Sequence, residues 1–153
     1  MNGHGSPSYC AQKMFSLHQG DEVLATEVQH LPTYAWQPPA RKVNGVEQPL
    51  PATREVKSLF YSATRETGSG KLIVKIVNRA DAPQALKIET NGVNAIAEKG
   101  TATVLKADNR DATNSPVDPK NVVPTMETVD GLGTTFPRAF PPCSITILEL
   151  QSK

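Results

Sequence analysis

One stretch of sequence decides the fold: Ala139-Phe140-Pro141-Pro142-Cys143-Ser144-Ile145-Thr146-Ile147-Leu148-Glu149-Leu150. Its two prolines end one element, because proline lacks the amide hydrogen that a helix or a central strand needs. The β-branched run that follows is typical of a strand. Chain ends stay loose unless the fold ties them down, so a chain that closes on its most apolar segment is expected to bury that segment. We therefore predict a buried strand over residues 145–150.

Sequence patterns typical of strands extend back to Val56. Strand signals recur at short intervals: the run 72–77, which is apolar on nearly both faces, the alternating run 86–90, the run 101–105, and Val129. Turn signals such as Gly68-Ser69-Gly70 and Asn91-Gly92 lie between them. This spacing predicts an all-β fold, an antiparallel β-sandwich of jelly-roll type, over residues 55–151.

A single helix signal precedes the strands. Ser6 suits an N-cap, Pro7 suits the first helical position, and Gly20 is placed to end the helix. Apolar and aromatic side chains between them follow the helical spacing i, i+3, i+4 and i+7, namely Ala11, Met14, Phe15 and His18. The pattern predicts one short amphipathic helix over residues 7–18.

A proline-rich segment separates the helix from the sandwich. Residues 23–28 predict a short strand, and residues 31–53 then hold several prolines without a regular period. Prolines at that density fit neither a helix nor a central strand, so we expect an extended surface connection. The predicted organisation is therefore a helical segment (1–20), a short strand with a Pro-rich connection (21–54), and the sandwich domain (55–151).

The length of the chain limits the number of domains, and its charge argues against some classes of partner. The 153 residues suit one domain with a single core. Sixteen basic and fifteen acidic residues nearly cancel, which argues against a nucleic-acid partner or a polybasic membrane contact. No apolar run reaches the roughly 20 residues of a membrane span. The first residues lack the basic and apolar regions of a signal peptide, so we expect a soluble chain and leave its compartment open.

Cysteines and histidines indicate neither a disulfide nor a metal site. Cys10 and Cys143 lie far apart and form no C-x-x-C unit, so we predict two independent reduced thiols. The three histidines (His4, His18 and His30) have no spacing that places two on one helical face or turn. We predict no metal and no cofactor.

Two aromatic residues of the Pro-rich segment are candidates for binding sugar. Tyr34 and Trp36 offer flat rings on which the C–H face of a sugar can stack. The competing interpretation is packing, because the only tryptophan of a domain is usually buried. Both interpretations remain open at this point.

Several further stretches follow one another in a specific order: Pro7-Ser8-Tyr9-Cys10-Ala11-Gln12-Lys13-Met14-Phe15-Ser16, Gly20-Asp21-Glu22-Val23-Leu24, Tyr61-Ser62-Ala63-Thr64-Arg65, residues 72–78, Gly100-Thr101-Ala102-Thr103-Val104-Leu105, Asn114-Ser115, Val122-Val123-Pro124 and the closing strand. In this order they resemble the last barrel helix and the C-terminal domain of α-L-arabinofuranosidases of glycoside hydrolase family 51. The likeness runs from about Pro7 to Leu150. It departs from the family at Cys143, where an aromatic residue is usual, and in residues 31–53.

The resemblance implies that this chain braces an enzyme and is not itself one. In that family both catalytic glutamates lie in a (β/α)8 barrel, and no residue here matches their motifs, so we predict no catalytic residue. The parent reaction would be retaining hydrolysis of terminal non-reducing α-L-arabinofuranosyl residues in arabinan or arabinoxylan. Its partners would be that barrel, the polysaccharide bound through the parent enzyme, and further copies in an oligomer.

The resemblance also gives an expectation for the helix. As the end of a barrel, it would pack Cys10, Met14, Phe15 and Leu17 partly against residues that this chain lacks. The alternative is a helix that belongs to the domain's own core. Two rival functions stay open: a stand-alone carbohydrate-binding sandwich that uses Tyr34 and Trp36, and a free-standing adhesion-type β domain.

Overall fold

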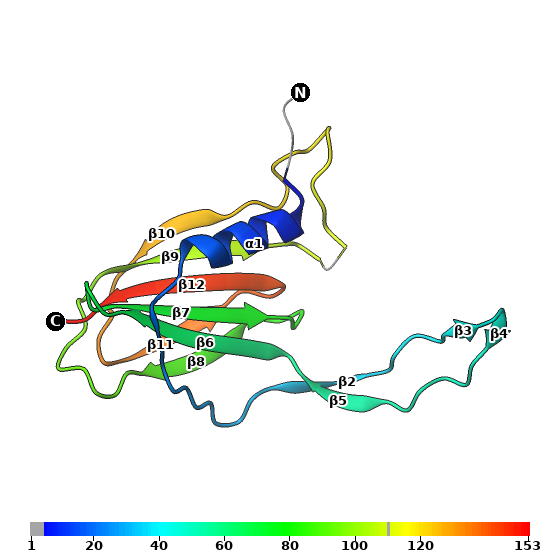
Figure 1. Ribbon diagram of the computed structural model, residues 1–153, viewed down its shortest axis with the longest axis horizontal. Helices are drawn as coiled ribbons and strands as arrows, with labels where there is room; N and C mark the ends of the chain where they lie inside the picture. The colour runs from blue at the N-terminus through cyan, green and yellow to red at the C-terminus, as the bar shows by residue number, and fades with distance from the viewer. Residues whose placement is uncertain (1–4, 110) are drawn as a thin grey trace.

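The computed structural model describes residues 5–109 and 111–153, so residues 1–4 of the predicted helical segment and Arg110 lie outside it. Figure 1 shows packed β-strands, one helix lying across them, and a long arm that projects from one end. The elements are α1 (Pro7–Leu17), β1 (Glu22–Val23), β2 (Thr33–Trp36), β3 (Lys42–Val43), β4 (Val46–Glu47), β5 (Arg54–Lys57), β6 (Leu59–Glu66), β7 (Lys71–Asn78), β8 (Gln84–Glu89), β9 (Gly100–Lys106), β10 (Thr125–Val129), β11 (Thr135–Phe140) and β12 (Ser144–Gln151).

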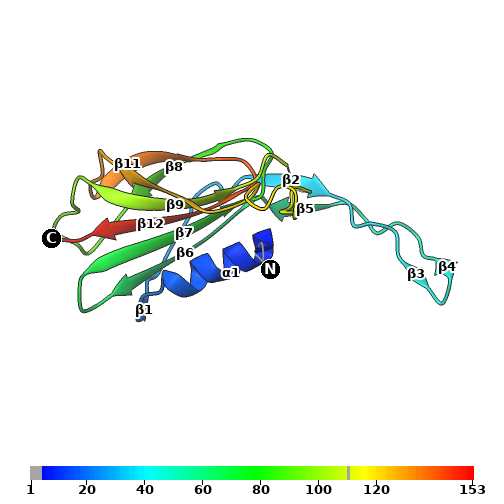
Figure 2. The same ribbon diagram turned by 90° about the horizontal axis from the view of Figure 1, so that it is seen from above.

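Two antiparallel sheets form the sandwich. The larger sheet has six strands in the order β1-β6-β7-β12-β9-β10, and the smaller pairs β11 with β8. Figure 2 shows the smaller sheet on one side of the larger sheet and α1 on the other. The prediction of an antiparallel β-sandwich preceded by one short helix is confirmed.

The closing strand β12 lies at the centre of the larger sheet. It pairs with β7 along its whole length and with β9 along most of it. Leu148 and Leu150 belong to the core between the sheets, whereas Ile147 packs on the side of α1, and all three are almost completely buried. Each such burial is worth about 1.5–3 kcal/mol. The predicted burial of residues 145–150 is confirmed for these side chains.

Helix α1 begins where the sequence predicted. The Ser6 hydroxyl accepts a hydrogen bond from the Tyr9 amide at 3.1 Å, and Pro7 is the first helical residue. Met14 is 3% exposed and packs in a cluster with Ile73, Leu105, Val122 and Ile147. The expectation that Met14 needs partners outside this chain is therefore wrong, because the sheet supplies them. No helix within the described residues is long and apolar enough to cross a membrane.

Two connections test the turn signals. Gly70, with a φ of 73°, lies in the tight turn that joins β6 to β7, as the signal at Gly68-Ser69-Gly70 predicted. Gly92 also has a positive φ, but β8 and β9 on either side of it do not pair with each other. The chain passes there from the smaller sheet to the larger one.

Two strand assignments need correction. The strand expected over 23–28 is limited to Glu22–Val23, after which only the Leu24 amide still bonds to β6, through the Ala63 carbonyl. Strand β11 was not predicted, because Pro137 interrupts its pattern. Proline is tolerated there because β11 is an edge strand, paired only with β8.

A buried amide ties the end of β7 to the segment before β12. Asn78 is 1% exposed, and its Nδ2 donates to the carbonyl oxygens of Ala82, Phe140 and Pro141 at 3.0, 3.2 and 2.8 Å. Its Oδ1 accepts a hydrogen bond from the Ala80 amide at 3.0 Å. One side chain thus satisfies backbone groups from two distant segments, as buried polar groups require.

Candidate functional site

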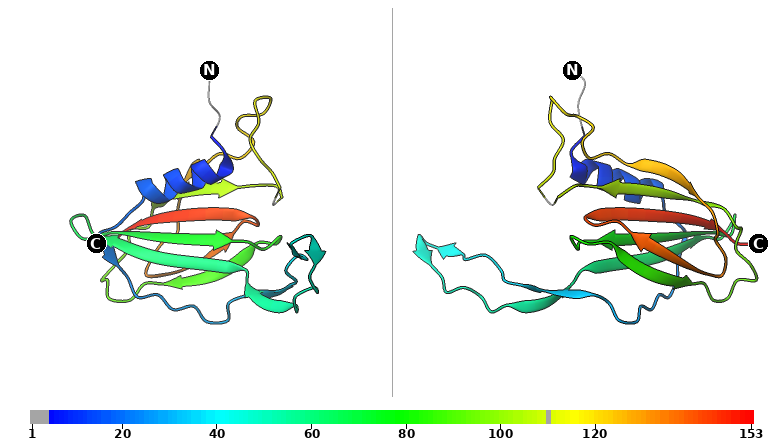
Figure 3. Two further views of the ribbon diagram at one scale, coloured as in Figure 1. Left: turned by 45° about the vertical axis from the view of Figure 1, so that its right-hand side comes forward. Right: turned by 180° about the vertical axis from the view of Figure 1, so that it is seen from behind.

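The Pro-rich segment does not lie over the surface as expected but forms a projecting arm with paired strands, which we define as residues 33–57 (Figure 3). The expectation failed because strands β2 and β5 at its two ends pair with each other. Within it β2 pairs with β5, so that Tyr34 lies opposite Val56 and Trp36 lies opposite Arg54. Alternate residues of a strand face the same side, so these four side chains share one face of the ribbon. The structure therefore brings the predicted sugar-binding residues Tyr34 and Trp36 onto one face, where both are partly buried.

Trp36 already has a cation over its ring. The guanidinium carbon of Arg54 lies 4.8 Å from the ring centroid, within the range of a cation–π interaction. The guanidinium occupies one flat side of the indole, which leaves only the other side for a stacked ligand. Sugar binding by Tyr34 and Trp36 remains a prediction.

The tip of the arm is a tight hairpin with an apolar pair. Strands β3 and β4 place Val43 opposite Val46, and the two residues between them, Asn44 and Gly45, have φ values of 52° and 80°. Positive φ at both central positions is the type I′ geometry that suits a two-residue hairpin. Val43 is 53% exposed and Val46 is 63% exposed, so the tip presents apolar surface to solvent.

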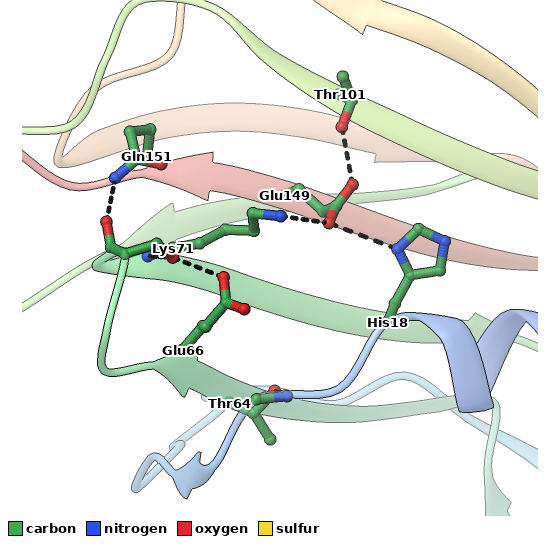
Figure 4. Close-up of polar contacts among 9 residues, drawn as sticks. His18, Thr64, Glu66, Lys71, Thr101, Glu149 and Gln151 are labelled. Carbon is green, nitrogen blue, oxygen red and sulfur yellow. Dashed lines mark hydrogen bonds and ion pairs between the residues drawn. The ribbon is translucent and has the colours of Figure 1, made fainter.

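A second candidate is a polar cluster between the end of α1 and the outer face of the larger sheet (Figure 4). Glu149 of β12 is at its centre. Its Oε1 lies 3.4 Å from His18 Nδ1 and 3.3 Å from Lys71 Nζ, and its Oε2 accepts a hydrogen bond from Thr101 Oγ1 at 3.1 Å. The cluster connects the helix end to β7, β9 and β12.

The electrostatics of this cluster favour an ionised carboxylate. Burial raises the pKa of Glu149, but the hydrogen bonds from Thr101 and Lys71, together with the charges of Lys71 and His18, outweigh it and hold the pKa below its ordinary value. The pKa of Asp21 is also lowered, mainly by the hydrogen bonds that it accepts from Thr67. Glycoside hydrolysis needs a carboxylic acid with a raised pKa to protonate the leaving group. Neither carboxyl meets this requirement.

Sequence reasoning missed both the polar cluster and the Arg54 contact. A signal for the cluster was available, because Glu149 is the one charged residue of the mostly apolar run 145–150. Such a residue needs a partner when it is buried. No local signal pointed to Arg54, because its contact with Trp36 depends on the register between two strands separated by the hairpin tip.

The two thiols lie at different places in the fold. Neither Cys10 nor Cys143, both of which the structure describes, forms a disulfide. Cys10 packs beside the Met14 cluster, whereas Cys143 has a φ of 45° in the turn before β12. Cys143 also lines a groove of about 410 Å³ between the start of α1 and the adjacent ends of β7, β9 and β12. Within the described part of the chain, no group of three His, Cys, Asp or Glu side chains is arranged to hold a metal.

Comparison with known sequences gives a match along almost the whole chain. A sequence profile of the α-L-arabinofuranosidase C-terminal domain matches residues 2–144. An extracellular exo-α-L-arabinofuranosidase of Streptomyces chartreusis is 34% identical over 90 residues, which make up 59% of this chain and 10% of that protein.

Solved structures share the fold. An arabinose-bound α-L-arabinofuranosidase named MgGH51 has a TM-score of 0.75 and 28% identity, and the match covers 98% of this chain and 20% of that one. The α-L-arabinofuranosidase of Thermotoga maritima, solved as an arabinose complex, has a TM-score of 0.74 at 24% identity, over 95% of this chain and 29% of that one. The second likeness shows the fold alone. In each case this chain spans less than a third of its relative's length.

Proposed function

This chain belongs to the α-L-arabinofuranosidase C-terminal domain family, and on that premise we propose that it braces the catalytic (β/α)8 domain of such an enzyme. The supporting observation is that the match covers nearly all of this chain but only a small part of its relatives. The family profile spans nearly the whole chain, yet the chain corresponds to only 20% of MgGH51 and 10% of the Streptomyces enzyme. A domain of this family belongs with a catalytic domain. The lowered pKa values suit structural carboxylates: Glu149 is held by ion pairs and hydrogen bonds, and Asp21 by its hydrogen bonds with Thr67.

The helix provides the physical link in this proposal. Residues 1–20 would be the last helix of the barrel, shared between the two domains. Met14 packs against the sheet, whereas Tyr9 and Leu17 of the same helix are 56% and 68% exposed. Exposed apolar groups on a helix that is already docked offer a surface for a barrel.

The reaction of the parent enzyme follows from the same premise. We propose retaining hydrolysis of terminal non-reducing α-L-arabinofuranosyl residues of arabinan or arabinoxylan, with both catalytic carboxylates supplied by the barrel. The comparisons do not favour the stand-alone carbohydrate-binding sandwich that the sequence left open.

Activity of the isolated chain is the first test. We expect the 153-residue chain to release no aryl group from an aryl α-L-arabinofuranoside above the rate of a buffer blank. The sequence shows no pair of carboxylates that could act as the acid and the nucleophile. Turnover that survives repurification would contradict the proposal.

A chimera tests the bracing role directly. The matching fifth of MgGH51 is exchanged for this chain, and the product is compared with MgGH51 lacking that fifth. We expect the chimera to melt in one transition, well above the truncated enzyme, because docking couples the two domains. Two independent transitions, or a truncated enzyme as stable as the chimera, would refute bracing.

A further inference from the structure

The arm has one apolar face and one polar face. On the first lie Tyr34, Trp36 and Val56, all partly buried, with the exposed Arg54 stacked over the Trp36 ring. On the other lie Ala35 and Glu55 opposite each other, both exposed. This division is typical of a sheet that is covered on one side and wet on the other.

Little within this chain holds the arm in place. Its base is anchored where the Ser58 amide and hydroxyl both donate to the Pro32 carbonyl at 2.9 Å. Beyond that point β2 and β5 pair with no other strand of the described residues, and every residue from 41 to 50 is exposed. Figures 1 and 3 show the arm extending away from the sandwich. An isolated two-stranded ribbon is marginally stable in water, so the arm requires an external surface to support it.

The far end of the arm is also apolar, and the arm as a whole is basic. Val43, Val46 and Leu50 are 53%, 63% and 62% exposed. Residues 33–57 hold four cations and two anions, a net charge of +2 (4 − 2): Arg41 and Lys42 with Glu47 near the tip, where Lys42 pairs with Glu47 at 3.1 Å, and Arg54 and Lys57 with Glu55 near the base. A complementary surface is therefore apolar with an acidic rim.

We propose that the arm is a clamp that binds an apolar, acid-rimmed patch on the catalytic domain of the same polypeptide. This inference rests on the proposed function. The arm lies within the span that matches MgGH51, because that match covers 98% of this chain, so it is part of the domain found beside a catalytic domain. A covalently joined partner is present at high effective concentration, which keeps an apolar arm covered.

Limited proteolysis tests the clamp. Trypsin should cut the isolated chain rapidly at Arg41 and Lys42, which are exposed at the tip. In the MgGH51 chimera described above, we expect cleavage at these two sites to slow by about tenfold or more, because a docked segment must open before it is cut. If the chimera melts in one transition but is cut as fast as the isolated chain, the clamp proposal is wrong, whereas the proposal that this domain braces the barrel still holds. Cleavage at the same rate in a chimera that melts in two transitions would overturn both.

Face-specific variants give the matched control. Trp36→Ser and Val56→Ser, on the apolar face, should restore rapid cleavage in the chimera. Thr33→Ser and Glu55→Gln, on the opposite face, should leave the protection unchanged. Equal effects from both faces would overturn the assignment of the apolar face.

The isolated chain provides a second measurement that does not depend on the chimera. Trp36→Ser should shift its melting temperature by less than about 2 °C, because the ring is not part of either core cluster of the described residues. A much larger loss would show that the face is used internally and would overturn the clamp. Trp36 is the only tryptophan, so its emission reports on the arm. A blue shift that grows with chain concentration would assign the face to a second copy instead.

Discussion

The position of α1 can be tested by shortening one buried side chain. Met14→Ala removes a residue that is 3% exposed and packs against Ile73, Leu105, Val122 and Ile147. Met→Ala changes in cores cost about 2–5 kcal/mol. We expect about 2–4 kcal/mol here, because the neighbouring Cys10 and Ala11 are only partly buried and can close over the cavity. For a chain of this size, each kcal/mol lowers the melting temperature by about 2–4 °C.

The control is Leu17→Ala on the same helix. Leu17 is 68% exposed, so in the isolated chain its loss should change the free energy of unfolding by no more than about 0.5 kcal/mol. Both substitutions introduce alanine into the helix, so differences in helix propensity are small. Thermal and urea unfolding, followed by circular dichroism, measure both variants. Equal shifts would refute the packing argument, and a Met14→Ala shift below about 2 °C would show that α1 contributes no core to this domain.

Two further predictions concern buried polar groups. Asn78→Asp should lower the free energy of unfolding by about 2–4 kcal/mol, because it keeps the acceptor for the Ala80 amide but loses the three hydrogen bonds that the side chain donates. The control is Asn91→Asp at an exposed turn, which should be nearly neutral when both variants are unfolded in urea. Glu149 has a lowered pKa, so its stabilising contribution is present above its ordinary value of 4.5 and is lost as the pH falls through the lower folded value. Glu149→Gln should therefore lower the free energy of unfolding near neutral pH and make that free energy depend less steeply on pH in acid. An unchanged slope of unfolding free energy against pH below the ordinary value of 4.5 would contradict this assignment.

The polar cluster and the arm would fix the sandwich relative to the catalytic domain in different ways. His18, Glu149 and Lys71 connect the end of α1 to the larger sheet, so the helix is fixed from both its apolar and its polar side. A helix held in this way transmits the position of the sandwich rigidly to anything docked on its outer side. The arm would then add a second point of attachment far from the helix, which restricts rotation of one domain against the other.

Local patterns predicted the parts of the fold that local physics controls. The Ser6 cap, Pro7 and the stripe through Met14 predicted α1, because capping and helical periodicity act within a few residues. The apolar run around Ile147 predicted a buried strand, because only a strand covered on both faces needs apolar side chains on both. Its central place in the larger sheet was not predicted. Strand β11 escaped prediction, since Pro137 is acceptable there because no other strand that the structure describes pairs with the far edge of β11.

The candidate site depended on contacts between distant segments. The sequence by itself determined that Tyr34 and Trp36 lie in a proline-rich segment and share a spacing of two, and it also carried the likeness to a family of known domains. Only the tertiary structure decided that this segment projects as an arm, that Arg54 lies over Trp36, and that Glu149 meets His18. The physical reason is that strand register and helix docking are set by pairings across many residues, whose energies no local pattern contains.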